Sequence, residues 1–255
     1  MKQAVNVLEE GKSNVRAVER ALDILLCFVE RSEWAMTEIA EKVGLHKSTV
    51  HRMLATLEDR GFVARNPATD RYRLGMRVWE LTAHLSNSDD PSVLLLPEME
   101  LLRDLLGETV SLYVRDGKER IRIQAVQSNQ AVRRVANVGA RLPLYVGASS
   151  KVLLAFGDDA TRRLVMEDED WPASMNRAAY VAKLEGIRTA GYATSIEERE
   201  AGAAAVSAPI FDRSGKLAAA LSVSGPSGRL TEDMMRAHAP TIIEAAKRMG
   251  MMLVK

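Results

Sequence analysis

Gly44 and Gly61 divide the N-terminal part of the chain into short helical segments, and these helix ends limit what this part can fold into. In "MTEIAEKVG", Ile39 and Val43 lie on one side of a helix that Gly44 ends. The next segment repeats apolar residues at helical spacing as far as Leu57, and Gly61 stops it. Only a few residues separate the two segments, so the spacing predicts two short helices joined by a tight turn.

An apolar stripe precedes these two helices, and strand-like runs follow them. Val18, Leu22, Leu25 and Val29 recur at helical spacing and predict a first helix over residues 15–30. After the third helix, "FVARNPATDRYRLG" holds two short runs around the turn-rich "NPATD", which predicts a β-hairpin. Three helices followed by a hairpin predict a winged helix-turn-helix.

The segment from Lys42 to Arg77 carries a local excess of positive charge. It holds eight basic and three acidic residues, which gives a net charge of +5. The whole chain is only +1, so the remainder is net −4. Such asymmetry is typical of a module that contacts the phosphates of nucleic acid.

Hydrogen-bond donors gather on the outer side of the third predicted helix, opposite Val50, Leu54 and Leu57. A recognition helix inserts its N-terminal residues into the major groove, where arginine can read guanine with two parallel hydrogen bonds. For any single residue, a solvated helix face is a competitive alternative. The candidate DNA-binding residues are Lys47, Ser48, Thr49, His51 and Arg52 in this helix, and Arg65, Arg71 and Arg73 in the hairpin.

A further helix is predicted after the hairpin, before "SNSDDPS" breaks the pattern. Leu74, Val78, Leu81 and Leu85 form one apolar stripe, with Trp79 beside it. We expect this stripe to pack against a partner subunit, because it is too apolar to face water along a lone linker. Packing against its own domain is the alternative. The expected divisions are a DNA-binding domain at 1–75, a linker helix at 76–90 and a second domain at 91–255.

Helices and strands alternate in the second domain, which makes the chain as a whole α+β. In "LAAALSVSG", Leu221 and Val223 share one face of a strand, and Ser222 and Ser224 lie on the other. The neighbouring strand brings small residues such as Ala205 to one of its faces. Small side chains leave volume above a sheet, as in a small-ligand pocket. Composition alone slightly favours the alternative, in which a helix packs closely over the alanines.

Several motifs together resemble the IclR family of bacterial transcription regulators. They are "VRAVERALDILLCF", "TEIAEKVGLHKSTVHRMLATLEDRGFV" and "RYRLG" in the first domain, and "RLPLYVGASSKVLLA", "GYATSIEERE" and "AAAVSAPIFDRSGKLAAALSVSGP" in the second. The resemblance covers nearly the whole chain. It implies a GAF-like α/β effector-binding domain after the winged helix, and a homodimer or a dimer of dimers that binds double-stranded operator DNA, more commonly as a repressor.

The same resemblance implies where a small-molecule effector binds. The positions are Gly147, Ala148, Ser195, Ala205, Ser222 and Ser224. Family members that bind small 2-oxo acids carry cysteine where this chain has Ala205. The departure removes a polar contact and adds room, so a carboxylate larger or more apolar than these, or an aromatic acid derivative, becomes a candidate.

Other function classes find little support in the sequence. The single cysteine, Cys27, lies in an apolar run and is expected to be a core residue, which excludes a disulfide framework. No run is long enough for a signal peptide or a membrane span, so we expect a soluble, cytoplasmic protein that does not contact a membrane. No metal or nucleotide motif is present, and we expect no cofactor, no metal site and no catalytic residue.

Two rival functions remain open at this point. An enzyme would need a base to activate the pocket serines, and none of the four histidines adjoins "SVSG" in sequence. These histidines are His46, His51, His84 and His238. The second rival is an architectural DNA-binding protein without an effector, which a fully packed second domain would favour.

Overall fold

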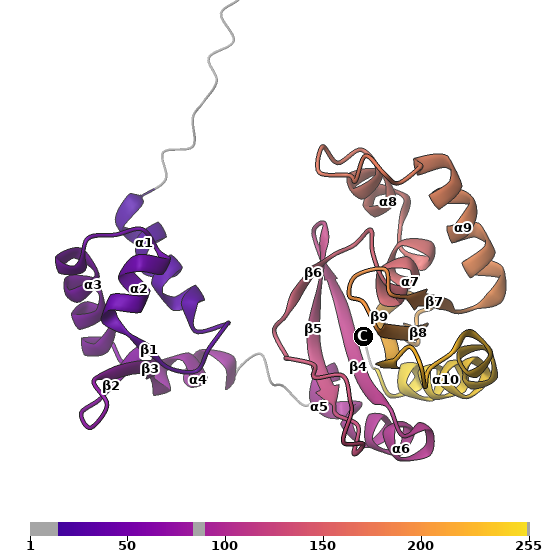
Figure 1. The fold of residues 1–255 in the computed structure, drawn as a ribbon, viewed down its shortest axis with the longest axis horizontal. Helices are drawn as coiled ribbons and strands as arrows, with labels where there is room; N and C mark the ends of the chain where they lie inside the picture. Colours follow the sequence, from indigo (N-terminus) through magenta and orange to yellow (C-terminus); the bar gives the residue numbers. More distant parts are fainter. Residues whose placement is uncertain (1–14, 84–89, 254–255) are drawn as a thin grey trace, which may run out of the picture. The chain divides into compact units, whose positions relative to one another are not determined.

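The computed structural model describes residues 15–83 and 90–253 (Figure 1). Its contacts divide the chain into two compact units, Met1–Leu85 and Ser86–Lys255. The division lies inside the range 76–90 that the sequence assigns to a linker. Each unit has its own apolar core, and the two are described separately below.

The N-terminal unit is the expected winged helix-turn-helix. Its helices are α1 (Arg16–Cys27), α2 (Met36–Lys42), α3 (Lys47–Asp59) and α4 (Met76–Ala83). Its strands are β1 (Trp34–Ala35), β2 (Val63–Asn66) and β3 (Arg71–Leu74), in the antiparallel order β1-β3-β2. The sequence predicts β2 and β3 but not the two-residue β1. Gly44, at φ 64°, makes the left-handed turn between α2 and α3.

The first helix has a different inner face from the one that its sequence stripe suggests. Ile24 and Cys27 are buried against the core, whereas Val18 and Leu22 are each more than half exposed. Cys27 is therefore a core residue, as expected. The exposed apolar residues follow helical spacing along α1 and just beyond its two ends: Val15, Val18, Leu22, Leu26 and Val29.

The C-terminal unit is built on a six-stranded antiparallel sheet in the order β6-β5-β4-β9-β8-β7. The strands are β4 (Thr109–Asp116), β5 (Glu119–Val126), β6 (Arg141–Pro143), β7 (Ala193–Ile196), β8 (Ala203–Phe211) and β9 (Leu217–Pro226). The helices are α5 (Pro91–Leu94), α6 (Leu96–Leu106), α7 (Ala148–Phe156), α8 (Asp159–Met166), α9 (Arg177–Ala190) and α10 (Glu232–Met252).

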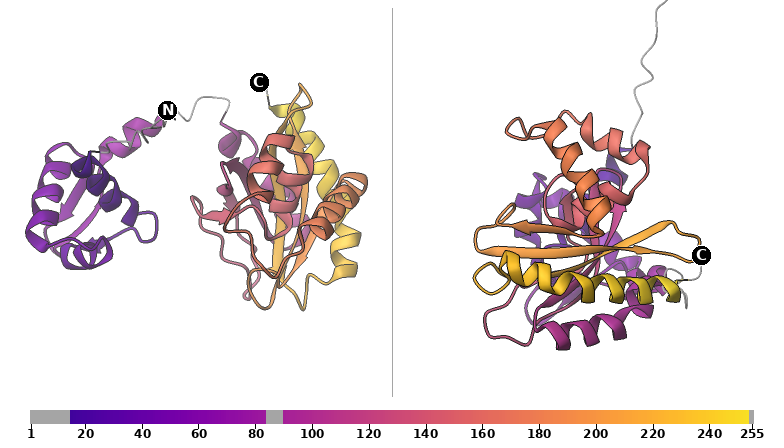
Figure 2. Two further views of the ribbon diagram at one scale, coloured as in Figure 1. Left: turned by 90° about the horizontal axis from the view of Figure 1, so that it is seen from above. Right: turned by 90° about the vertical axis from the view of Figure 1, so that its right-hand side faces the viewer.

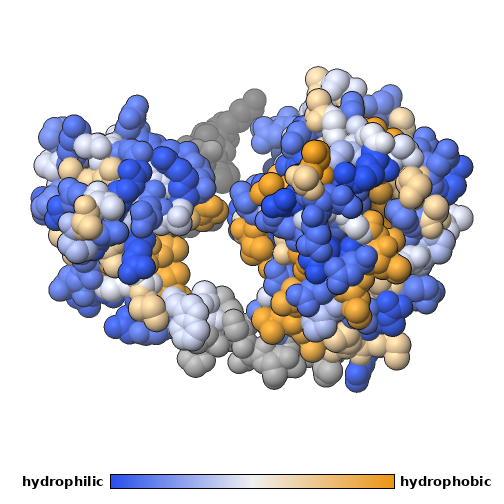
Figure 3. Space-filling view, turned by 60° about the horizontal axis from the view of Figure 1, so that its bottom comes forward, coloured by the Kyte–Doolittle hydropathy of each residue, from blue (hydrophilic) through white to orange (hydrophobic). Residues whose placement is uncertain are grey.

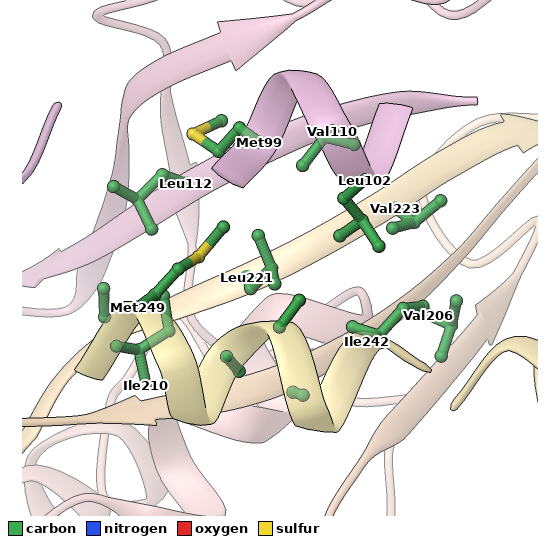
Figure 4. Close-up of a cluster of buried hydrophobic side chains, with 14 of the residues drawn as sticks. Met99, Leu102, Val110, Leu112, Val206, Ile210, Leu221, Val223, Ile242 and Met249 are labelled. Atoms are coloured by element: carbon green, nitrogen blue, oxygen red, sulfur yellow. The ribbon is translucent and has the colours of Figure 1, made fainter. Parts of the chain in front are cut away.

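Helices cover both faces of this sheet (Figure 2). On one face, α6 and α10 bury Leu221 and Val223 with large aliphatic side chains such as Ile242, and this cluster is drawn in Figure 4. On the other face, α7, α8 and α9 form a second cluster that reaches the sheet at Tyr113 and Ala220. From Ala220 to Ser224, the alternation along β9 therefore places large residues under α10 and small ones under α7, as its sequence predicts.

Local signals set the ends of α9, one of the helices over the second cluster. The Asn176 carboxamide oxygen accepts a hydrogen bond from the Ala179 amide at 2.9 Å, which caps the first turn. Gly191 ends the helix at φ 79°. Across residues 15–83 and 90–253, no helix combines the length and apolar composition that crossing a membrane requires.

A close backbone contact between α10 and β8 generates a stability prediction. A Cβ atom on Gly250 would lie 2.0 Å from the Phe211 carbonyl oxygen, so Gly250→Ala must displace α10. We expect a loss of about 1–3 kcal/mol of unfolding free energy, the usual result of overpacking. Gly186→Ala in α9 is the matched control, because nothing lies within 4 Å of its Cβ position. The control should gain up to about 1 kcal/mol from helix propensity. Equal midpoints for the two variants in urea unfolding would contradict this packing.

Candidate functional site

The outer side of α3 presents the donor side chains selected from the sequence. Val50 and Leu54 are fully buried, whereas Lys47, Ser48 and Arg52 are exposed. His51 is exposed as well, and Thr49 is half-buried. These residues therefore lie on or beside one solvent-facing side of a helix that begins at Lys47. That they bind DNA stays a prediction.

The sequence reasoning missed the contribution of His46 to this helix. Its Nδ1 accepts a hydrogen bond from the Ser48 amide at 3.3 Å and lies 2.8 Å from the Ser48 hydroxyl. His46 thus caps α3 and holds the Ser48 side chain. The position directly before a helical stripe could have signalled this cap.

The three hairpin arginines differ in what they already contact. Arg71 donates to the Glu38 carboxylate at 2.7 Å, and Arg65 pairs with Asp70 at the turn. Glu38 in turn accepts from the Ala35 amide, so Arg71 joins β3 to the start of α2. Arg73 is exposed and forms no ion pair within residues 15–83 and 90–253. Among the three, Arg73 therefore has the charge most available to a phosphate.

A cavity of about 50 Å³ lies where β8 and β9 meet the start of α7. At roughly 10–15 Å³ for each water, it holds only a few water-sized groups. Its walls include every position that the family resemblance implies for an effector: Gly147, Ala148, Ser195, Ala205, Ser222 and Ser224. The structure thus brings these residues together, and their binding of an effector stays a prediction.

Strand register explains why four small residues meet there. Ser195 pairs with Ala205, and Ala205 pairs with Ser224 on the next strand, so the three form one row across β7, β8 and β9. In the adjacent row, the Ser207 hydroxyl donates to the Ser222 hydroxyl at 2.8 Å. Ser222 still has its own proton to donate. Ser195 and Ser224 form no side-chain hydrogen bond with any residue that the structure describes.

The first turn of α7 closes one end of the cavity. Gly147 precedes this helix at φ 95°, a conformation that favours glycine. The Gly147 amide donates to the Glu198 carboxylate at 3.1 Å. The next amides lie in the helix's first turn, where backbone donors have no helical acceptor and the helix dipole favours an anion.

Charged residues make up the part of the wall that the sequence reasoning missed. The lining includes Tyr113, Arg120, Arg122, Arg134, Glu198, Arg199 and Glu200. "ERIRIQ" held the signal, because arginines two apart in a strand face the same side. Two arginines on the buried face of a strand are unusual, since buried charges need partners.

Arg120 is buried but contacts no carboxylate. Its Nη1 donates to the carbonyl oxygens of Pro143 at 2.6 Å and Val146 at 2.8 Å, and also contacts the Ser150 hydroxyl. Its Nε is buried without a hydrogen-bond partner. Burial lowers the pKa of Arg120 to about 10, and although Tyr113 opposes this shift, the charges of Arg199 and Arg122 add to it.

Arg122 lies on the same face of β5, two residues along. Its Nε and Nη2 donate to the Tyr113 hydroxyl at 3.0 and 2.5 Å, and its Nη1 donates to the Asn137 carbonyl at 3.0 Å. Both guanidinium groups approach the Tyr113 ring: the Cζ atom is 5.3 Å from the ring centroid in Arg120 and 5.1 Å in Arg122. Across the described ranges, neither arginine forms an ion pair with Asp or Glu.

The two glutamates of the wall already have other partners. Lys151, which is almost wholly buried, pairs with Glu198 and donates to the Thr194 carbonyl at 2.9 Å. Burial alone would raise the pKa of Glu198, but the hydrogen bond and charge of Lys151 outweigh it and lower that pKa. Glu200 pairs with Arg134 at 2.5 Å. The glutamates therefore do not neutralise Arg120 and Arg122.

No histidine in the described residues lines this cavity. His46 and His51 belong to the N-terminal unit, His238 lies in α10, and His84 lies outside the described residues. The cavity serines thus have no imidazole beside them among these residues. The site can bind and orient an anion through hydroxyls, backbone amides and guanidinium groups.

Comparison with known proteins places both units in one family. Residues 90–250 match the family described as bacterial transcriptional regulator IclR C-terminal, and residues 17–67 match the IclR helix-turn-helix domain. The HTH-type transcriptional regulator KdgR of Escherichia coli is 30% identical over 248 residues, which cover 95% of this chain and 94% of KdgR.

Two further relatives are similar over most of their length. The HTH-type transcriptional repressor AllR of Escherichia coli is 29% identical over 252 residues, covering 96% of this chain and 92% of AllR. An IclR homologue of Microbacterium hydrocarbonoxydans, whose crystal structure is a complex with 4-hydroxybenzoate, is 26% identical with a TM-score of 0.73. That comparison covers 90% of this chain and 98% of the homologue.

Proposed function

The chain belongs to the IclR family of bacterial transcriptional regulators, and from this premise we propose that it is a cytoplasmic repressor released from its operator by a small organic acid. The family consists of DNA-binding regulators rather than enzymes, and its C-terminal domain binds an effector. The observation that carries the proposal is the cavity that gathers all six expected effector positions at the start of α7.

We assign operator reading to α3 and phosphate contact to the hairpin. Arg52 is exposed on α3 and can donate two parallel hydrogen bonds to a guanine. Arg73 is exposed on β3 and has no intramolecular ion pair among the described residues. The half-buried Arg71 already binds Glu38, so it contributes to the fold of the unit as well as to its charge.

The DNA assignment predicts different losses for these arginines. Arg52→Ala should weaken binding to the operator by about 1–3 kcal/mol and leave non-specific DNA binding nearly unchanged. Arg73→Ala should weaken both kinds of binding. Because one phosphate contact is lost, the slope of the logarithm of the binding constant against the logarithm of salt concentration should become shallower by about 1. Arg71→Ala should in addition lower the thermal midpoint of the N-terminal unit.

Fluorescence anisotropy with operator and random duplexes, over a range of salt concentrations, measures these losses. Arg188→Ala is the control, because it removes an equal charge from α9 in the other unit. An unchanged operator preference in Arg52→Ala would exclude this residue from base reading.

We propose that the exposed apolar surface of the N-terminal unit is covered by a second copy of the chain. Trp79 and Leu81 on α4 are 67% and 59% exposed, and the residues of the α1 stripe are exposed as well. Figure 3 shows hydrophobic residues gathered on one side of this unit. Since monomeric proteins rarely expose large apolar patches, both helices are candidates for a dimer interface. Leu85 of the expected stripe lies outside the described residues.

The assembly proposal predicts that a charge on α4 separates the subunits. Leu81→Asp should convert dimers to monomers, because a carboxylate cannot be buried in an apolar interface without a partner. Operator affinity should fall with it, since two half-sites would no longer be bound together. Analytical ultracentrifugation measures the subunit mass, and Val181→Asp on the exposed side of α9 is the control. An unchanged sedimentation coefficient for Leu81→Asp would contradict the proposal.

We propose that the carboxylate of the effector binds to the hydroxyls of Ser195, Ser222 and Ser224, called the serine row below, and to the backbone amides in the first turn of α7. Ser195 and Ser224 carry hydroxyls without side-chain partners among the described residues, and Ser222 can donate its remaining proton. The backbone at Gly147 and Ala148 brings the α7 amides to the same space. A carboxylate placed there would accept several charge-assisted hydrogen bonds, which are roughly twice as strong as neutral ones.

The effector assignment predicts a selective loss in the serine variants. The double variant Ser222→Ala with Ser224→Ala should weaken acid binding tenfold to a hundredfold or more, because each lost charge-assisted hydrogen bond costs about 1.5–3 kcal/mol. Its operator affinity without acid should be unchanged. Ala205→Leu should block the cavity by volume alone.

Calorimetry and operator-release assays with the same acids measure both effects. Ser214→Ala, in the turn between β8 and β9, is the control outside the cavity. If the double variant binds and responds like the parent, the effector does not use these hydroxyls.

A further inference from the structure

The effector cavity holds more positive charge than a single carboxylate would neutralise. Its wall contains four arginines and two glutamates, and Lys151 and Arg134 already pair with the glutamates. Arg199 is 3.8 Å from Glu200, which it shares with Arg134. Arg120 and Arg122 contact only carbonyl and hydroxyl oxygens among the described residues. Two buried positive charges therefore remain without a carboxylate.

The positive groups also lie close to one another. Arg120 and Arg122 both approach the Tyr113 ring, and the charge of Arg199 acts on Arg120 from the segment after β7. The Arg120 Nη2 is 3.0 Å from the Cβ position of Gly147, directly before the first turn of α7. Like charges in a weakly polar interior repel strongly. Two of the guanidinium groups are 3% and 5% exposed, so water screens this repulsion poorly.

From this arrangement we infer that the effector is a small acid with two anionic groups, and that Arg122 and Arg199 bind the second group. This inference rests on the proposed function, since the first carboxylate takes the serine row and the α7 amides. Guanidinium groups suit this role, because their planar donors match carboxylate and phosphate oxygens. The unpartnered Nε of Arg120 adds a donor in the same wall.

The polar lining of the cavity favours a short diacid over an aromatic ring. The apolar part of the lining consists of alanines and Tyr113, whose hydroxyl already accepts from Arg122. The cavity thus lacks the broad apolar surface that aromatic ligands usually bury. The expectation from the sequence that Ala205 admits a larger, more apolar or aromatic acid stays a prediction, and 4-hydroxybenzoate in the panel below tests it.

The test compares acids of equal length that differ in charge. Calorimetry on the full chain should use succinate against butyrate, with oxalate, malonate and 4-hydroxybenzoate beside them. Succinate or a shorter diacid should bind tenfold to a hundredfold more tightly than butyrate, since it gains charge-assisted hydrogen bonds to the arginines. 2-Phosphoglycolate distinguishes the two chemistries, because tighter binding than succinate would assign the second group as a phosphate.

Two arginine variants separate ligand binding from a role in folding. Arg199→Gln changes a partly exposed side chain and should fold normally, and Arg122→Gln keeps a donor for Tyr113. Either variant should lower succinate affinity far more than butyrate affinity, and so bring the two affinities close together. Arg188→Gln on α9 is the control of equal charge and should keep the preference for the diacid.

Three results would overturn the inference, or a part of it, in distinguishable ways. Equal binding of succinate and butyrate by the parent, with operator release by both, would exclude the second anionic group and leave the proposed function standing. Absence of binding by every acid in the panel would overturn the proposed function and the inference together. A diacid preference that survives in both arginine variants would assign the second group to another part of the wall.

Discussion

The two faces of β9 carry side chains of very different size, and the C-terminal unit is organised around this difference. Leu221 and Val223 fill the space under α10, so that face of the sheet is densely packed. Ser222 and Ser224 on the opposite face are too short to fill the space beneath the start of α7. A cavity therefore persists inside an otherwise close-packed domain, and its walls are polar because the residues that create it are serines.

Burying arginines beside such a cavity costs free energy unless something compensates their charge. Arg120 and Arg122 receive carbonyl and hydroxyl acceptors, which satisfy part of their donors and hold carbonyl groups of the segment from Asn137 to Val146. They receive no carboxylate among the described residues, and their mutual repulsion persists. A bound anion would relieve that repulsion and raise the stability of the folded state by mass action. The same residues would thus serve the fold and the ligand.

Much of the architecture could be predicted from the periodicity of apolar residues and from the glycines that end helices. Gly44 and Gly61 bound the helices of the DNA-binding unit, and the alternation in β9 correctly sorts Leu221 from Ser222. The sequence did not predict strand β1, because two residues are too few to show the alternation of buried and exposed side chains that marks a strand. The inner face of α1 was misjudged because its most regular apolar stripe is the exposed one. Arg120 and Arg122 were missed because a charged pair in a strand gives no sign of burial until β4, β5 and α7 are placed together.

In the function proposed above, binding of one small acid in the cavity is coupled to binding of the operator. Linkage requires that if the acid weakens operator binding by some factor, the operator weakens acid binding by the same factor. Calorimetric titration of succinate into the protein, free and saturated with operator duplex, measures this directly. We expect the dissociation constant for succinate to rise with operator present, by the factor seen in operator release. Equal constants in the two titrations would contradict it.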